Sequence, residues 1–297
     1  MSEISCFLTV DEEIRKFRTR RAHLVRNGLE SLGLDHPIIR GDELADYAIA
    51  NEVAFHLRES IEKSQGSEIE LRASAHELLE DGARALVAVD SVKALQCAGL
   101  DEDQCMFSHG LAIASPSSRE RELLTSAVRV LERTGNLRCF SDTVGVVAVL
   151  GIATPGAPTA TWATGGLPYV VHLHLMPRAE LVARDLIHEA THAYLNDWLA
   201  SRGLRLDPYT PIFWSPWKDA KRPLFGFVHS IMAFSVVTAF LASVMSDDSS
   251  DWFWLSPFHS AERDRLRSCE ESVASAVSML PDDLGKRVAA IYALAVE

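Results

Sequence analysis

Hydrophobic residues recur at helical spacing along most of the chain, and Gly and Pro mark the breaks between these runs. Near the N-terminus, Thr9-Val10-Asp11-Glu12 has the spacing of a capping box and opens an amphipathic segment that ends before Gly33. The charge-free run Pro223–Met245 has the length of a long buried helix. The pattern as a whole predicts helices over about residues 10–32, 42–64, 68–96, 117–133, 181–199 and 223–245, and two more within 260–297.

Two short stretches have the pattern of strands instead. Val144–Ile152 is β-branched, uncharged and interrupted by Gly, which is typical of a buried strand. In Tyr169–Met176, aliphatic residues alternate with two histidines. Thr154–Gly166 has the composition of a loop, and Gln104–Ala114 is ambiguous, with a strand as one interpretation. We therefore expect an α+β protein that is mainly helical, with a small β-sheet.

The composition changes near residue 137, where the charged helical segments give way to the strand pattern. This change predicts a helical N-terminal subdomain, 1–136, and a second region, 137–297, or else one continuous domain. At 297 residues, 47% of them hydrophobic, the chain can bury a large core. The net charge of −12 argues against binding to nucleic acid or to an anionic membrane.

Cysteine usage and the N-terminus favour a cytoplasmic protein. The five cysteines are scattered and form no CxxC pair, which fits reduced thiols better than a disulfide framework. The N-terminus lacks the basic start and apolar run of a signal peptide. Pro223–Met245 is long enough to cross a bilayer, but it stands alone and carries several hydroxyl side chains and His229, so we expect a core helix.

The strongest chemical signal is the pentapeptide His188-Glu189-Ala190-Thr191-His192 within the predicted helix 181–199. Two histidines four residues apart differ by about 40° around a helix, so both imidazoles can reach one point. A single helix chelates a transition metal in this way. The alternative is a pair of surface or capping histidines on either side of a glutamate that forms a salt bridge.

A catalytic metal site needs a third protein ligand. Leu195 and Trp198 stand where a metzincin would have its glycine and third histidine, and no glutamate follows the motif before Glu262. His229 remains, in the middle of the charge-free helix. We therefore predict a zincin-like HExxH helix packed on a second buried helix that carries the third ligand, although a lone histidine on an apolar helix is usually a core residue.

Arg222 precedes His229 by seven residues, which is about −20° around a helix and about 10.5 Å along it. If the helix extends back to Arg222, both side chains face the same way. A cation placed one small dicarboxylate away from a metal is what 2-oxoglutarate binding requires, because the keto acid end chelates iron while the cation holds the distal carboxylate. Alternatively, Arg222 is a surface charge that flanks the helix.

The chain resembles the HExxH-motif peptide-modification family, whose members are regarded as 2-oxoglutarate-dependent peptide β-hydroxylases of ribosomal peptide natural-product (RiPP) pathways. The resemblance depends on the HExxH pentapeptide, on the run Ser215–Pro223 with the sequence SPWKDAKRP, and on Gly226–His229. It covers about residues 161 to 240 and does not extend over the N-terminal helices.

The resemblance implies an Fe(II) enzyme that uses O₂ and 2-oxoglutarate to hydroxylate an unactivated carbon of a peptide, which is in some cases a precursor with a leader. It implies that His188, His192 and His229 hold iron, and that Arg222 holds the cosubstrate together with Lys218. Lys218 stands where arginine is common in the family.

The residues alone leave the metal and the reaction open. Three neutral imidazoles suit Zn, Fe or Ni. With zinc, the same residues would make a metallopeptidase with Glu189 as general base; in the oxygenase, Glu189 is expected to be a proton carrier or to support a ligand. A third possibility is a peptide-binding module with a structural metal.

Four further residues are weaker candidates. Asp185 could orient an imidazole or form an exposed salt bridge, and His172 and His174 could line a substrate groove or simply lie at the surface. Trp217 could pack over the site or belong to the core. Oligomeric state is not indicated by any pattern.

Overall fold

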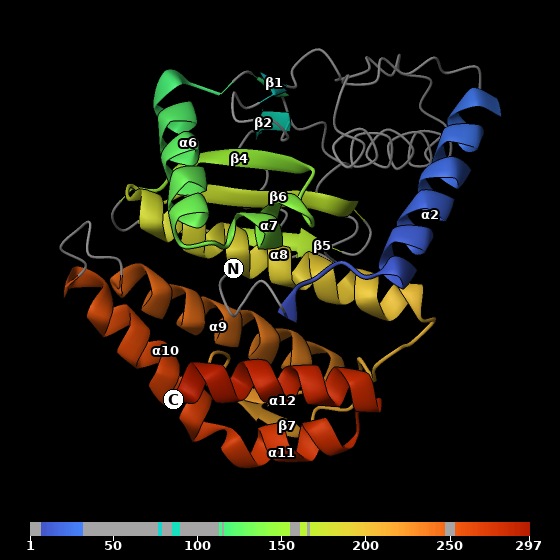
Figure 1. Ribbon diagram of the computed structural model, residues 1–297, viewed down its shortest axis with the longest axis vertical. Helices are drawn as coiled ribbons and strands as arrows, with labels where there is room; N and C mark the ends of the chain where they lie inside the picture. The colour runs from blue at the N-terminus through green and yellow to red at the C-terminus, as the bar shows by residue number, and fades with distance from the viewer. Residues whose placement is uncertain are drawn as a thin grey trace.

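The described residues of the computed structural model are 7–31, 77–78, 85–89, 113–114, 116–154, 161–164, 167–246 and 253–297. They are arranged in layers, in which the sheet lies on one side of helix α8 (Ala179–Ser201) and helix α9 (Leu224–Met245) lies on the other (Figure 1). The C-terminal helices cover the outer side of α9 (Figure 1). This layering confirms the expectation of a mainly helical protein with a small sheet.

The sheet is mixed, with its parallel strands in the middle. Its order is β1 (Glu77–Leu78), β2 (Ala85–Val89), β4 (Val146–Ile152), β6 (Leu167–Leu175) and β5 (Thr161–Thr164), and β3 (Ile113–Ala114) also pairs with β2. Strand β4 is parallel to both β2 and β6, whereas β5 runs antiparallel to β6 at the edge. Alternate residues of β4 and β6, such as Val147 and Leu173, are fully buried in the core shared with the helices.

Helix α8 agrees with the predicted helix 181–199 to within two residues at each end. It is buried on nearly all sides, as expected from its apolar residues on more than one face. The half-buried positions Arg184, His188, His192 and Asn196 are spaced by four residues and therefore form a single stripe. Both motif histidines thus lie on the one side of α8 that solvent reaches along its central turns.

Helix α9 begins at Leu224, after Pro223 as its N-cap, and most of its residues are buried. It packs against α8, α10 (Ser256–Ser268) and α12 (Asp282–Val296). By length and composition it could cross a membrane, but 89% of its most apolar stretch is buried inside the protein. Such burial is what a core helix shows.

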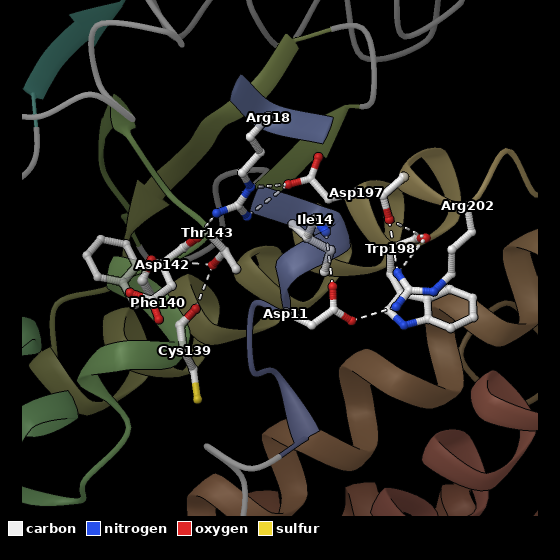
Figure 2. A network of polar contacts seen from close by, with 11 residues as sticks. Asp11, Ile14, Arg18, Cys139, Phe140, Asp142, Thr143, Asp197, Trp198 and Arg202 are labelled. Atoms are coloured by element: carbon white, nitrogen blue, oxygen red, sulfur yellow. Dashed lines mark hydrogen bonds and ion pairs between the residues drawn. The ribbon is translucent and has the colours of Figure 1, made fainter. Parts of the chain in front are cut away.

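Helix α2 (Glu12–Ser31) is fastened to α8 by a buried ion pair (Figure 2). Arg18 Nε and Nη2 lie 2.9 and 2.8 Å from Asp197 Oδ2 on α8, and Arg18 Nη1 donates to the backbone oxygen of Asp142 at 2.6 Å. The Asp197 side chain is 5% exposed. The first long helix of the chain is therefore tied to the helix that carries the HExxH motif.

Two other elements of the region before residue 137 also contact the second region. Helix α6 (Ser118–Arg133) matches the predicted helix 117–133, opens with a complete capping box at Ser117, and packs on α8. Strand β2 pairs with β4. The division at 136–137 stays a prediction, but it is bridged by these contacts.

Several sequence predictions were wrong in detail. The predicted helix 68–96 contains β1 and β2, because the short apolar run Ala85–Val89 fits a buried strand as well as a helix. The predicted loop 154–166 contains the edge strand β5. The segment 104–114 ends in strand β3, which agrees with the strand interpretation at its last two residues. The predicted helix 42–64 lies outside the described residues.

The C-terminal region contains more elements than expected. In place of two helices after residue 260, it forms α10, α11 (Glu270–Ser278) and α12, preceded by the 3-10 turn η2 (Phe253–Leu255). Cys269 ends α10 and leads directly into α11, so the sequence pattern shows no loop there. A small hairpin of β7 (Phe213–Ser215) and β8 (Ala220–Arg222) precedes α9.

Candidate metal centre

The three predicted ligand histidines lie side by side. His188 Nε2 and His192 Nε2, both on α8, are 3.1 Å apart. His229 Nδ1, on α9, is 3.0 Å from His192 Nδ1. Two nitrogen ligands of one metal ion are separated by about 3.0 to 3.4 Å, so both separations are in the range that a shared ion requires. The structure therefore brings together His188, His192 and His229 from two parts of the chain.

The ring nitrogens nevertheless do not all face one point. His192 contacts His188 through Nε2 but His229 through Nδ1, on different edges of its ring. Among the described residues, no group of three or more His, Cys, Asp or Glu side chains is arranged to hold a metal ion as it stands. A shared ion requires the rings of His192 and His229 to turn about their Cβ–Cγ bonds, which are broad and weakly restrained torsions.

The observed arrangement is a chain of hydrogen bonds between neutral rings. A neutral imidazole has one donor and one acceptor nitrogen, so His192 donates to one neighbouring ring and accepts from the other. His229 Nε2 is buried and has no hydrogen-bond partner within the described part of the chain. A buried, unpaired ring nitrogen is costly, and binding to a metal would offset that cost. The donor set thus fits a transition metal in its chemistry, whereas its geometry requires the rings of His192 and His229 to turn.

Burial keeps these imidazoles neutral, as metal binding requires. Burial and, to a smaller extent, the nearby Arg222 guanidinium lower the pKa of His192 to about 4. The pKa values of His188 and His229 are lowered well below the usual value by burial and then by the neighbouring His192. Few protons therefore compete with a metal ion for these nitrogens near neutral pH.

The same pKa shifts predict an acid-sensitive metal-free protein. The unfolded chain protonates its histidines near pH 6.5, whereas folded His192 stays neutral down to about pH 4. Between these values the unfolded state binds more protons, so the free energy of unfolding falls as the pH is lowered, on the order of 3 kcal/mol from His192 alone. Urea unfolding of chelator-treated protein from pH 7.5 to 4.5 measures this loss. In His192→Gln the free energy of unfolding should depend less on pH. The same pH dependence in this variant and in wild type would show that His192 is not the cause of the loss.

Arg222 is the last residue of β8 and not part of the helix, because α9 begins only at Leu224. Its side chain nevertheless runs along the first turns of α9, where Nη1 donates to Ser230 Oγ at 2.8 Å. Its positive charge lowers the pKa values of both His192 and His229. The guanidinium therefore lies near the histidine cluster, as predicted, although the predicted reason, a helix extending back to Arg222, was wrong.

Aromatic rings surround the cluster. Phe225 contacts the His229 ring with centroids 4.3 Å apart, and Phe234 meets the His188 ring edge-on at 4.9 Å. Trp217 stacks on Phe234 at 4.2 Å with nearly parallel rings, and its Nε1 donates to Glu262 Oε2 on α10 at 2.7 Å. Trp217 thus packs over the site, which was one of its two predicted roles.

Glu189 and Lys218 are placed very differently. Glu189 is 2% exposed, and its Oε1 lies 4.0 Å from His188 Nε2. This position suits a group that carries a proton next to the cluster. Lys218 is exposed in the turn between β7 and β8, and no contact joins it to Arg222 or to the histidines in the described residues. The structure does not bring Lys218 into the site.

The weaker candidates are not part of the cluster. Asp185 is bound by Arg184 Nε and Nη2 at 2.8 and 2.6 Å, so it forms the predicted salt bridge, but in a buried and not an exposed position. His172 and His174 are buried and not at the surface as expected. Burial lowers the pKa of His172 to about 3, and its ring stacks on Trp162.

Sequence reasoning missed Phe225, Phe234, Ser230 and Glu262, and it used Gly226 only as part of the match over Gly226–His229. The positions of Gly226 and Ser230, four and eight residues after Arg222, could have indicated a path for its side chain along the helix. The contact between Trp217 and Glu262 joins distant parts of the chain and left no local signal. No known family model and no curated protein matches this chain.

Proposed function

We propose that this chain is an Fe(II)- and 2-oxoglutarate-dependent oxygenase that hydroxylates a carbon, in particular a β-carbon, of a peptide residue in ribosomal peptide natural-product biosynthesis. His188, His192 and His229 would hold the iron. Arg222 would bind the distal carboxylate of 2-oxoglutarate. When bound, the iron would supply the activation of O₂ that insertion into an unactivated C–H bond requires.

The observation that carries the proposal is the place of Arg222. A guanidinium that is half-buried, hydrogen-bonded to Ser230 and close enough to shift the pKa values of two clustered histidines is suited to a small anion that spans the distance to the cluster. Its planar fork matches a carboxylate with two charge-assisted hydrogen bonds. The hydrolytic step of a zinc peptidase needs a metal-bound water and a general base, and does not itself use this cation.

The other residues have roles that follow from their contacts. Phe225 and Phe234 pack against His229 and His188, which limits the access of water to the cluster. Glu189 is placed to hold a proton beside His188 Nε2. Trp217, fixed by Glu262, covers Phe234 and forms part of the wall that a peptide substrate would meet.

Glu189 also supports the alternative of a zinc metallopeptidase. A buried carboxylate 4.0 Å from the nitrogen of a predicted ligand is where a general base would lie for a metal-bound water. In that case Arg222 would have no part in binding a 2-oxo acid. The two activities are therefore separated by testing Arg222.

Replacement of Arg222 by leucine is expected to weaken 2-oxoglutarate binding by about 100-fold, because two hydrogen bonds between charged groups are lost. Anaerobic titration of the Fe(II) protein measures this through the visible charge-transfer band, while Fe(II) affinity itself should change little. Lys221→Met removes an exposed cation from the same strand and is the matched control. Equal 2-oxoglutarate affinity in Arg222→Leu and wild type would contradict the proposal.

Two results would favour the alternatives. Peptide cleavage by zinc-loaded protein, with no band from Fe(II) and 2-oxoglutarate, would favour the peptidase. Peptide affinity without turnover, unaffected by alanine at His192, would favour a binding module. A mass increase of one oxygen on a peptide encoded beside this gene would support the oxygenase directly.

A further inference from the structure

The Arg222 side chain fits against α9 only because residue 226 has no side chain. A Cβ atom built on Gly226 would lie 2.8 Å from Arg222 Nη2 and 3.0 Å from both Cζ and Nε. The first separation is shorter than real Cβ contacts and the other two are tighter than most, so a methyl group there would push the guanidinium away from the helix. The close approach explains the need for a glycine in the first turn of a buried helix, where its low helix propensity is otherwise unfavourable.

Ser230 binds the other terminal nitrogen of the same guanidinium. Its Oγ accepts a hydrogen bond from Arg222 Nη1 at 2.8 Å and donates one to the backbone oxygen of Gly226 at 2.9 Å. Ser230 is 5% exposed and follows His229 directly in the chain. Gly226 and Ser230, four residues apart, therefore form one seat on α9 that sets where the guanidinium lies relative to the His229 ring.

We propose that Gly226 and Ser230 are positioning residues that act through Arg222 and make the site selective for a 2-oxo acid with a second, distal carboxylate. This inference rests on the proposed function, since it assigns the selectivity of the same site. A 2-oxo acid with a neutral tail keeps the keto acid end but cannot pair with Arg222. Gly226 and Ser230 therefore determine the preference for a 2-oxo acid with a distal carboxylate over one with a neutral tail, and do not determine the affinity for the metal.

The test compares 2-oxoglutarate with 2-oxopentanoate, which has the same five-carbon chain but a methyl group in place of the distal carboxylate. Binding of each to Fe(II)-loaded protein is measured without O₂ in wild type, Gly226→Ala and Ser230→Ala. Wild type should prefer 2-oxoglutarate strongly. Gly226→Ala should lose at least about tenfold of this preference, with 2-oxopentanoate affinity changed by less than about twofold, and Ser230→Ala should lose less.

Thermal unfolding separates this effect from misfolding. The atoms that would clash belong to the end of a flexible side chain, and alanine favours helix, so the melting temperature of Gly226→Ala should be unchanged or raised while selectivity falls. Gly28→Ala is the matched control, because Gly28 is an exposed glycine of α2 with no atom within 4 Å of an added Cβ. It should leave both quantities unchanged or raise only the melting temperature.

The possible results distinguish a failure of the role assigned to Gly226 from a failure of the proposed oxygenase function. If wild type prefers 2-oxoglutarate and Gly226→Ala retains the full preference, the role of Gly226 is refuted while the oxygenase proposal stands. If wild type binds both ligands equally, the proposed function itself fails. If Gly226→Ala loses selectivity and also has a lowered melting temperature, the added methyl group disturbs more of the fold than the end of the Arg222 side chain. That result would contradict a role of Gly226 in positioning Arg222 alone.

Discussion

Replacing His192 by alanine is expected to abolish metal binding and with it any turnover. The His192 ring lies between the other two, 3.1 Å from His188 Nε2 and 3.0 Å from His229 Nδ1, so its loss breaks both contacts at once. Loss of a group that merely supports a ligand costs about 10- to 100-fold in metal affinity, so loss of a central ligand should cost at least about 100-fold. Anaerobic Fe(II) binding, measured by equilibrium dialysis, checks this.

The matched control is His259→Ala. His259 lies on α10, and none of the hydrogen bonds or ring contacts of the three clustered histidines in the described residues involves it. This variant should bind Fe(II) as wild type does. Stoichiometric Fe(II) binding by His192→Ala at wild-type affinity would show that residues other than this histidine cluster hold the iron.

The second large effect is expected from Arg18→Met, which would leave the Asp197 carboxylate buried without its cation (Figure 2). Removing one partner of a buried ion pair typically costs about 3 to 5 kcal/mol. For a protein of this size the melting temperature should fall by roughly 10 °C. Because burial already raises the pKa of Asp197, the lone carboxylate should become protonated in the variant, which limits the loss at low pH.

Two variants test the cause of that loss. Lys16→Met removes an exposed ion pair with Glu12 on the same helix and should leave the melting temperature unchanged. Arg18→Met combined with Asp197→Asn removes the unpaired negative charge of Asp197 and should recover much of the lost melting temperature. Equal melting temperatures for wild type and Arg18→Met would show that this pair does not fasten α2 to α8.

The sequence predicted α8 and α9 well because each has an uninterrupted pattern. The HExxH spacing requires a helix for its histidines to share a face, and the observed half-buried stripe through His188 and His192 agrees with it. The charge-free run predicted the start of α9 to within one residue, because Pro223 is the N-cap and the helix begins at Leu224. His229 was identified by elimination, and its ring lies beside His192 as that argument required.

Other features depend on contacts that have no local signature. The short run Ala85–Val89 forms a strand because β4 lies beside it, and nothing within five apolar residues distinguishes that outcome from a helix. The path of the Arg222 side chain depends on the missing Cβ of Gly226, which the spacing of these residues could indicate but not establish. The orientation of the histidine rings is set by torsions that spacing does not determine.

The central claim is that three imidazoles from α8 and α9 can bind one ion. The most direct test is an anomalous difference map at the iron edge from crystals prepared with Fe(II) and 2-oxoglutarate without O₂. The account predicts one peak within about 2.2 Å of a nitrogen of His188, of His192 and of His229, with the last two rings turned from their metal-free positions. A peak bound by His188 and His192 alone, with His229 still directed at His192 Nδ1, or no peak at the cluster, would contradict it.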